Sequence, residues 1–315
     1  MVTFRAWEYD ATMASVPTRP ISTIALTTGA GPSPGIVTLD PSIARALAGQ
    51  DAFEALMSAD GDVFRHHKNR RTVRIECGAR RYFIKTHHWA GWPEIVRNLF
   101  RLRLPVLTAR PEYLAIRRLH ELGVPTMTCA GFGARGRHPA RRRSFIVTEA
   151  LEGHRDLASL SVLWSALPAR QRRRLQRRAI REVALIARTL HAHGLNHRDF
   201  YLCHFLTPDR HWSSWTGADG MPLHLIDLHR MQMRSRTPLR WLVKDLSGLL
   251  FSVLDLDLAA RDYLRFLRVY WGPDWKRRFR RTGLLRRFIV ARAITLYRRK
   301  QGRLPRTNPG LASSS

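Results

Sequence analysis

The spacing of apolar positions divides the chain into an amino-terminal part that predicts strands and a carboxyl-terminal part that predicts helices. Three short segments at 62–67, 71–77 and 80–87 are rich in β-branched or aromatic residues and are separated by turn signals, which is typical of strands. The apolar run at 144–151 predicts a further, buried strand. Residues 110–123 predict a helix, with Pro111 in its first turn and Gly123 after its last.

From about residue 155 onward the pattern becomes helical. Residues 169–194 predict a long helix that ends at Gly194, with Arg on its outer face. The apolar residues expected on its inner face are Leu175, Ala179, Ile180, Val183, Ile186, Ala187 and Leu190. The segments 239–255, 257–271 and 274–300 predict further helices, whereas the turn-rich ends 1–37 and 303–315 predict flexible tails.

This order of elements predicts an α+β protein with a bilobal, protein-kinase-like fold. Strands, one helix, a strand and then helices follow one another as they do in that fold. We expect a small β-rich N-lobe with one main helix at 38–153. A larger, mostly helical C-lobe should follow at 154–302, with the HRD stretch just after its long helix.

The composition is ordinary except for its charge. The 315 residues include 54 Lys and Arg against 24 Asp and Glu, a net charge of +30. Either an Arg-rich coding bias decorates solvated helix faces, or the protein has an anionic partner such as nucleic acid, an acidic membrane or a phosphorylated substrate. Cys77, Cys129 and Cys203 form no disulfide framework and suit a reducing cytoplasm. With neither a signal peptide nor a bilayer-length apolar run, we expect a soluble or peripheral protein.

Four residues stand in the order that phosphoryl transfer from ATP requires. Such a site needs a strand Lys for the phosphates, a helix Glu to hold it, a carboxylate base and a carboxylate for Mg²⁺. Lys85 ends a strand in "YFIKT", and Glu112 lies in the first turn of the next helix. Asp199 closes "HRD", and Asp227 follows the apolar run of "HLID". Singly, each has a purely structural interpretation, such as a surface lysine or a carboxylate at a helix dipole; together they predict a kinase.

Two features depart from the protein-kinase pattern. The first two strands are joined by "HHKNRRT" and not by a Gly-rich loop, so Lys68, Arg70 or Arg71 would replace the backbone amides that hold phosphates. Asp227 is followed by Leu and His where protein kinases have Phe and Gly. Both features argue against an ordinary protein kinase.

Position 204 differs as well, because it is His where the catalytic-loop Asn is expected. His204 could bind a divalent metal, although Mg²⁺ prefers oxygen, or it could orient Asp199. The sequence leaves both roles open. We expect Asp245 to open a helix and, together with His197, to support the catalytic loop.

The segments "HRDFYLCHFL", "LIDLHRMQ", "YFIKTH", "SFIVTEAL" and "RTPLRWLVKDLSGL" resemble those of the lipopolysaccharide core heptose(I) kinase family and of the related Kdo kinases. The resemblance covers about residues 62 to 300 and includes the His at 204. It implies an ATP- and Mg²⁺-dependent phosphotransferase that acts on a heptose hydroxyl of the inner core. It also implies a peripheral location at the cytoplasmic face of the inner membrane of a Gram-negative bacterium.

The resemblance further implies a role for individual residues. Lys85 and Glu112 would form the nucleotide pair, Asp199 would be the base and Asp227 the Mg²⁺ ligand. The hinge that holds adenine would be the stretch containing Thr148, Glu149 and Leu151. The Arg residues that follow Asp227 are predicted to line the sugar-phosphate site, unless they are solvated surface residues; they are Arg230, Arg234, Arg236 and Arg240.

The implied acceptor is a lipid-anchored glycolipid that contains lipid A, Kdo and heptose. Its negative charges would attract a strongly basic peripheral protein, as would an anionic membrane surface in general. The alternatives are a kinase of another acceptor, such as Kdo or a protein Tyr, and a pseudokinase scaffold. A nucleic-acid-binding protein is a further alternative, but the Arg runs lack interleaved aromatic residues, so no specific nucleic acid is expected.

Overall fold

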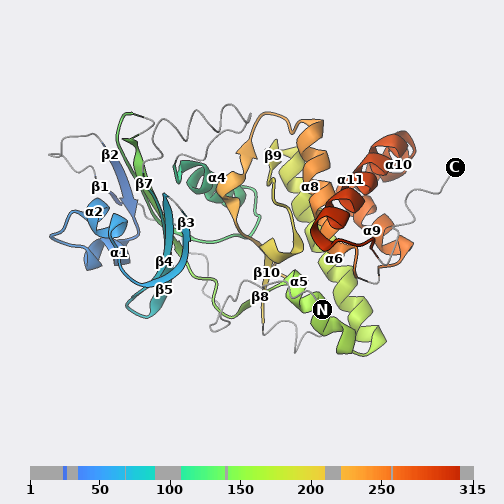
Figure 1. Cartoon of the computed structure of the whole chain (residues 1–315), viewed down its shortest axis with the longest axis horizontal. Coiled ribbons are helices and arrows are strands. Elements are labelled where there is room, and N and C mark those ends of the chain that lie inside the picture. Colours follow the sequence, from blue (N-terminus) through green and yellow to red (C-terminus); the bar gives the residue numbers. More distant parts are fainter. Residues whose placement is uncertain are drawn as a thin grey trace.

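The computed structural model describes residues 24–26, 35–67, 69–88, 108–138, 141–209, 221–256 and 258–305. A β-sheet part and a helical part lie toward opposite ends of the long axis of the molecule (Figure 1). The predicted α+β class, with a β-rich amino-terminal part and a mainly helical carboxyl-terminal part, is confirmed. Within the described residues no helix is long and apolar enough to cross a membrane.

The amino-terminal sheet has seven strands, all antiparallel to their neighbours, in the order β1-β2-β6-β7-β5-β4-β3. The strands are β1 (Ile24–Leu26), β2 (Gly35–Leu39), β3 (Asp62–His67), β4 (Arg70–Cys77), β5 (Arg80–His87), β6 (Cys129–Arg135) and β7 (Arg143–Glu149). Our predicted tail, 1–37, differs from this arrangement because β1 and the first part of β2 fall within it. The apolar side chains of Val37 and Leu39 in β2 are buried. Their alternating spacing is typical of a strand, but the turn-rich residues before them dominated the prediction.

Helices cover both faces of this sheet. The short helices α1 (Pro41–Ala46) and α2 (Ala52–Met57) pack on one face, where Phe53 and Ile84 belong to one apolar cluster. Helix α4 (Arg110–Glu121) packs on the other face, where Ile116 and Ile146 belong to the main core. Because successive residues of a strand point to opposite faces, Lys85 points to the face opposite Ile84, toward α4.

The carboxyl-terminal part is built on six helices within the described residues. They are α5 (Leu157–Leu163), α6 (Ala169–Ala192), α8 (Leu239–Val253), α9 (Ala260–Trp271), α10 (Trp275–Arg281) and α11 (Gly283–Gln301). The prediction that 274–300 is helical is confirmed, but as two helices, because the chain breaks between α10 and α11. Thr282 and Gly283 are both weak helix formers, which explains the break.

Short strands connect the two parts and hold the loops of the site. The strands β8 (His154–Asp156), β10 (Phe205–Pro208) and β11 (His224–Leu225) form one small sheet, and β9 (Leu195–Asn196) pairs with β12 (Gln232–Met233). Gly194, between α6 and β9, has φ +77°. A Cβ there would lie 1.8 Å from the carbonyl oxygen of Arg234, so only glycine permits the close approach of these two segments.

Helix α6 buries its apolar side as predicted. Six of the seven expected inner residues are buried, and the partly buried Ile180 lines a cavity beside the helix. This helix places Gly194, and with it the HRD stretch, against the core.

Candidate active site

Lys85 and Glu112 form an ion pair between the sheet and α4. The Nζ atom of Lys85 lies 2.6 Å from Oε1 of Glu112. The Glu112 side chain is 1% exposed and that of Lys85 is 25% exposed, so the ammonium faces the space between the lobes while the carboxylate is buried behind it. Glu112 does lie in the first turn of α4, as predicted.

The HRD stretch is held from behind by Asp245 of α8. Its carboxylate oxygens accept hydrogen bonds from the backbone N–H groups of His197 and Arg198, each at 2.7 Å. Asp245 is fully buried, so these bonds to a charged group are protected from water. Arg198 adopts a left-handed conformation, φ 74°, which is uncommon for residues other than glycine. Asp245 lies within α8 and not at its start, a correction to the sequence-based expectation.

His197 links this loop to the segment that carries Asp227. Its ring is fully buried, and Nε2 donates a hydrogen bond to the carbonyl oxygen of Ile226 at 2.9 Å. Burial lowers the pKa of His197, since the charged ring would lose its hydration. This hydrogen bond therefore fixes the segment after β9, which leads to Asp199, relative to the segment after β11, which leads to Asp227.

His204 links the backbone of Asp199 to the carboxylate of Asp227. Its Nδ1 donates to the backbone carbonyl oxygen of Asp199 at 2.7 Å, and its Nε2 is 3.5 Å from Oδ2 of Asp227. Burial opposes protonation of the ring. However, the hydrogen bond and charge of Cys203, the charge of Asp227 and the hydrogen bond to Asp199 outweigh burial and raise the pKa of His204 to about 9.

Asp227 is surrounded by positive groups. It has φ 63°, a left-handed conformation that is rare for residues other than glycine. Nδ1 of His229 donates to Oδ1 of Asp227 at 2.5 Å. Burial would raise the pKa of Asp227, but the hydrogen bond and charge of His229 and the charges of Lys85 and His204 hold it well below its usual range. The carboxylate is therefore ionised and lies close to Lys85.

Asp199 is paired with Arg230, one of the predicted acceptor residues. The Nη1 atom of Arg230 lies 2.8 Å from both carboxylate oxygens of Asp199. The Asp199 side chain is 17% exposed and the Arg230 side chain 36% exposed. A cation therefore holds the candidate base, and both side chains remain partly exposed to solvent.

Further cations gather next to this pair around the indole ring of Trp241. The charged groups lie 4.9 to 5.9 Å from the ring centroid; they belong to Arg198, Arg240, Lys244 and Arg234. We call these four residues and Trp241 the Trp241 cluster. Burial and the nearby charge of Arg230 lower the pKa of Lys244 to about 8. Such crowding of positive charge favours a bound anion.

The predicted acceptor residues therefore divide into three environments. Arg230 binds Asp199, and Arg234 and Arg240 belong to the Trp241 cluster. Arg236 is exposed and has no ring contact among the described residues. The sequence analysis missed Arg198, Lys244 and Trp241, although Arg198 belongs to the HRD motif and Lys244 immediately precedes Asp245.

The predicted hinge lies where β7 leaves the sheet. Thr148 is buried, and the N–H groups of Glu149 and Ala150 donate to the carbonyl oxygens of Thr128 and Arg81. Leu151 packs against the main core. The structure shows no hydrogen bond of the Leu151 N–H within the described part of the chain.

The basic residues predicted to replace a Gly-rich loop are only partly described. Lys68 lies outside the described residues. Arg71 donates to Oδ1 of Asp60 at 2.9 Å, and Arg70 acts electrostatically on the buried ring of His87. Burial, together with the charges of Arg70 and Lys85, lowers the pKa of His87 to about 3.

Comparison with known proteins gives a consistent result. Residues 54–270 match the family described as the lipopolysaccharide kinase (Kdo/WaaP) family. The chain is 45% identical over 265 residues to the lipopolysaccharide core heptose(I) kinase WaaP of Pseudomonas aeruginosa, covering 84% of this chain and 97% of that protein. It is 41% identical over 237 residues to the protein of the same name from Escherichia coli K12, covering 75% of this chain and 88% of that protein.

A solved structure is also similar. It is described as WaaP in complex with acyl carrier protein, and it has 41% sequence identity and a TM-score of 0.69 to this chain. The similarity covers 83% of this chain and 99% of the other. The bilobal, kinase-like arrangement predicted from the order of elements is thereby confirmed.

Proposed function

Because the chain belongs to the lipopolysaccharide kinase (Kdo/WaaP) family, we propose that it transfers the γ-phosphoryl group of ATP to a heptose hydroxyl of the lipopolysaccharide inner core. The observation that carries this proposal is that the Lys85–Glu112 pair lies close to Asp227, which His204 in turn links to Asp199. Relatives that are 41 to 45% identical over most of their length are named heptose(I) kinases.

The residues present fit Mg·ATP. Mg²⁺ is commonly held by one or two carboxylates together with phosphates and water, and the ionised Asp227 supplies such a carboxylate. In the described part of the chain no group of three or more His, Cys, Asp or Glu residues could hold a metal ion, so phosphate and water oxygens would complete the coordination of Mg²⁺. Lys85, fixed by Glu112, would face the α- and β-phosphates, and the Leu151 N–H would face adenine. When bound, Mg·ATP supplies the phosphoryl group and neutralises part of its charge.

Asp199 would accept the proton of the heptose hydroxyl. Its carboxylate is oriented by Arg230, and its backbone is fixed through His204 and the amides bound by Asp245. Because catalysis of phosphoryl transfer consists largely of positioning, this rigid support is as important as the base itself. We assign His204 to orienting the loop, since its Nδ1–H donates to the Asp199 carbonyl oxygen and its Nε2 faces the Asp227 carboxylate.

The Trp241 cluster would receive an anionic group of the acceptor. The cluster lies close to Asp199, since the carboxylate of Asp199 interacts electrostatically with both Lys244 and Arg198. A glycolipid that carries Kdo carboxylates and lipid A phosphates fits such a site, and a protein with net charge +30 would work at an anionic membrane surface. We therefore propose that the enzyme works at the cytoplasmic face of the inner membrane.

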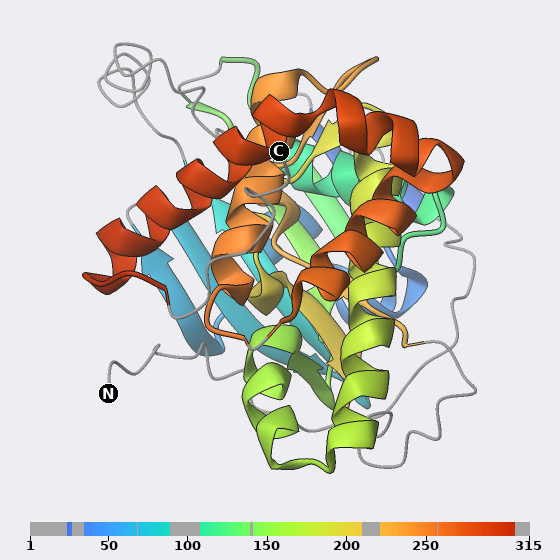
Figure 2. The same ribbon diagram turned by 90° about the vertical axis from the view of Figure 1, so that its right-hand side faces the viewer.

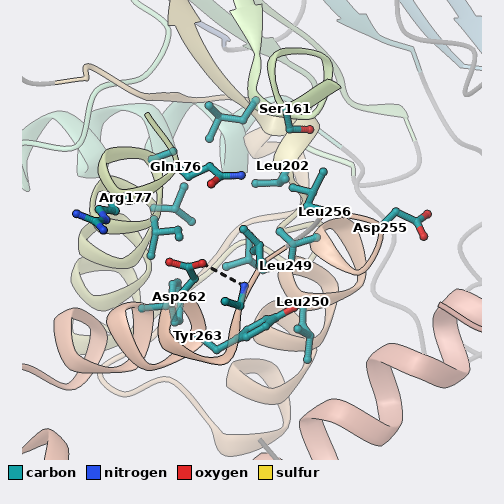
Figure 3. Close-up of a pocket in the computed structure, with 18 of the residues that line it drawn as sticks. Ser161, Gln176, Arg177, Leu202, Leu249, Leu250, Asp255, Leu256, Asp262 and Tyr263 are labelled. Carbon is teal, nitrogen blue, oxygen red and sulfur yellow. Dashed lines mark hydrogen bonds between the residues drawn. The ribbon is translucent and has the colours of Figure 1, made fainter. Parts of the chain in front are cut away.

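An acyl carrier protein is a further partner that we propose, because the similar solved structure is of WaaP bound to one. A cavity of about 620 Å³ lies among α5, α6, α8, α9 and α11. In Figure 3, Leu249, Leu250 and Leu256 line it, and Arg177 and Asp255 lie at its edges. Its volume and apolar wall suit an acyl chain. Leu202, three residues after Asp199, also lines this cavity, so an occupant would stabilise the catalytic loop.

One experiment tests the activity directly. Purified protein is given γ-labelled Mg·ATP and core lipopolysaccharide that lacks heptose phosphate, with Asp199→Asn as the control variant. We expect the label in the glycolipid, and a loss of about 10²–10⁴-fold in Asp199→Asn. Intact Mg·ATP binding without transfer would contradict a heptose acceptor and favour Kdo or a protein acceptor. Loss of Mg·ATP binding as well would favour a scaffold.

A further inference from the structure

Helices α10 and α11 form a strongly basic end of the chain. Residues 275–301 contain eleven Lys and Arg residues and no Asp or Glu. They are the last two helices in the described part of the chain. Helix α11 packs across the outside of α8 (Figure 2). None of the proposed catalytic residues lies in this segment, so its charge needs an explanation of its own.

The inner side of α11 is packed against the C-lobe. Val290, Ala293 and Tyr297 are buried there in one apolar cluster with residues of α8 and α9. This packing fixes which side of the helix faces outward.

The outer side of α11 has a central line of uncharged residues that begins with two large apolar side chains. Leu284 is 83% exposed and Phe288 59% exposed, and both are large apolar side chains. Ala291 and Thr295, also exposed, continue the same line, because positions 284, 288, 291 and 295 recur every three or four residues. We call these four residues the α11 stripe.

Exposed arginines flank the α11 stripe on both sides. At 100° per residue, Arg287 and Arg298 fall on one side of it, and Arg292 and Arg299 on the other. An apolar strip between two cationic borders is the pattern of a helix that lies in the plane of a membrane surface. A bilayer offers both partners at once, because its lipid phosphates match the arginines and its acyl chains match the exposed Leu284 and Phe288.

We propose that the outer face of α10 and α11 binds an anionic lipid bilayer, with the α11 stripe inserted among the acyl chains and the flanking arginines on lipid phosphates. This inference rests on the proposed function to the extent that the acceptor is a lipid-anchored glycolipid. It goes further by assigning the membrane contact to one helix face.

The position of this face suits an acceptor that is embedded in the membrane. The ring of Tyr201, two residues after Asp199, is 5.9 Å from Phe251 of α8, and Phe251 is 6.1 Å from Tyr297 of α11. The positive charge of Arg292 also acts on the phenol of Tyr201. Phe251 alone therefore lies between Tyr297 of α11 and Tyr201 of the catalytic loop, which brings the helix of the proposed membrane contact close to Asp199.

Sedimentation of the full-length protein with vesicles tests the proposal without ATP or acceptor. The vesicles contain phosphatidylcholine alone or mixed with phosphatidylglycerol. We expect binding to the mixed vesicles, and a loss of on the order of tenfold in Leu284→Gln/Phe288→Gln, which removes the apolar stripe but keeps all charges. Both side chains are exposed, so the variant should fold normally, which its unfolding curve verifies.

Matched variants separate this face from the general positive charge. Arg287→Glu/Arg299→Glu should lose binding to mixed vesicles, whereas Arg170→Glu/Arg174→Glu on exposed positions of α6 makes the same change in net charge and should lose little. Ile36→Gln, which alters another exposed apolar residue on β2, should bind as the wild type does. Equal losses for the α11 and α6 charge variants, or none for the Leu284/Phe288 variant, would overturn the proposal.

Activity measurements distinguish failure of this proposal from failure of the proposed function. The Leu284/Phe288 variant should phosphorylate a soluble, deacylated core oligosaccharide as well as the wild type does, but should be impaired on acceptor in vesicles. If the wild type phosphorylated neither acceptor yet bound vesicles through α11, only the proposed function would fail. If the variant lost binding to an acyl carrier protein and kept vesicle binding, the face would be a protein dock, which overturns the membrane proposal.

Discussion

Removing Lys85 should destabilise the protein more than removing Glu112, although the two side chains form a single ion pair. The Lys85→Met variant leaves a carboxylate that is 1% exposed, and its second oxygen, Oε2, has no partner within the described residues. Breaking a buried pair in this way costs about 3–5 kcal/mol of unfolding free energy.

Removal of Glu112 should lower the unfolding free energy less, because the Lys85 ammonium that remains is partly exposed to water and has a second anionic neighbour. The Lys85 side chain is 25% exposed, and its charge also interacts with Asp227. Glu112→Gln should therefore cost about 1–2 kcal/mol. In the double variant Lys85→Met/Glu112→Gln no buried charge remains, so we expect it to be more stable than Lys85→Met alone, with a coupling energy of about 1–3 kcal/mol.

Urea unfolding followed by far-UV circular dichroism, without nucleotide and at neutral pH, measures these differences. The control is the pair of Arg80 and Glu149, which joins atoms 2.7 Å apart in the same sheet but leaves the Arg80 side chain 44% exposed. Arg80→Met should cost less than about 1 kcal/mol. The reasoning is refuted if Lys85→Met costs no more than Arg80→Met, or if the double variant loses the sum of the two single losses.

Three further predictions concern other parts of the site. Asp245→Asn should lower the unfolding free energy by about 3 kcal/mol, measured in urea, because the amides of His197 and Arg198 lose a charged acceptor; an unchanged value would contradict that role. His87 has a folded pKa of about 3, below the ordinary 6.5, so the unfolded chain takes up its proton first and stability is lost as pH falls from 6.5 toward 3. His87→Gln should flatten this decline by up to about 1.4 kcal/mol per pH unit in unfolding titrations. Trp241→Leu should raise the KM for glycolipid about tenfold and leave the KM for ATP unchanged, since the ring organises the cations around it; equal effects on both would contradict an acceptor site.

The contacts that the sequence allowed us to anticipate are those of residues whose local context fixes their direction. Lys85 ends an alternating strand and Glu112 begins an amphipathic helix, so each must face the gap between sheet and helix, and they meet at 2.6 Å. The same argument applies to Asp227, which follows a short buried strand. Acidic residues are scarce in this chain, which makes each one informative.

The partners of the arginines could not be predicted in the same way. With 54 Lys and Arg residues, a basic position is uninformative by itself, and a long flexible side chain can reach several acceptors. Arg230 is expected to line the acceptor site, and its pairing with Asp199 could not be foreseen from its position in the sequence. The Trp241 cluster joins the catalytic loop, the β12 region and α8, so it exists only once the tertiary structure has formed. The break at Thr282 was missed because the apolar spacing continues across it.

The positive charge of this chain has two structurally different locations, and salt should affect them differently. The Trp241 cluster is partly buried, with Lys244 and Arg198 desolvated enough to lower their pKa. The arginines of α11 are exposed to solvent. At about 0.15 M ionic strength the screening length is about 8 Å in water, and buried charges are screened less. Raising the salt concentration should therefore weaken binding to anionic vesicles steeply while changing the KM for a soluble core oligosaccharide little. Parallel salt titrations of the two quantities check this, and equal slopes would mean that both reflect only the net charge of +30.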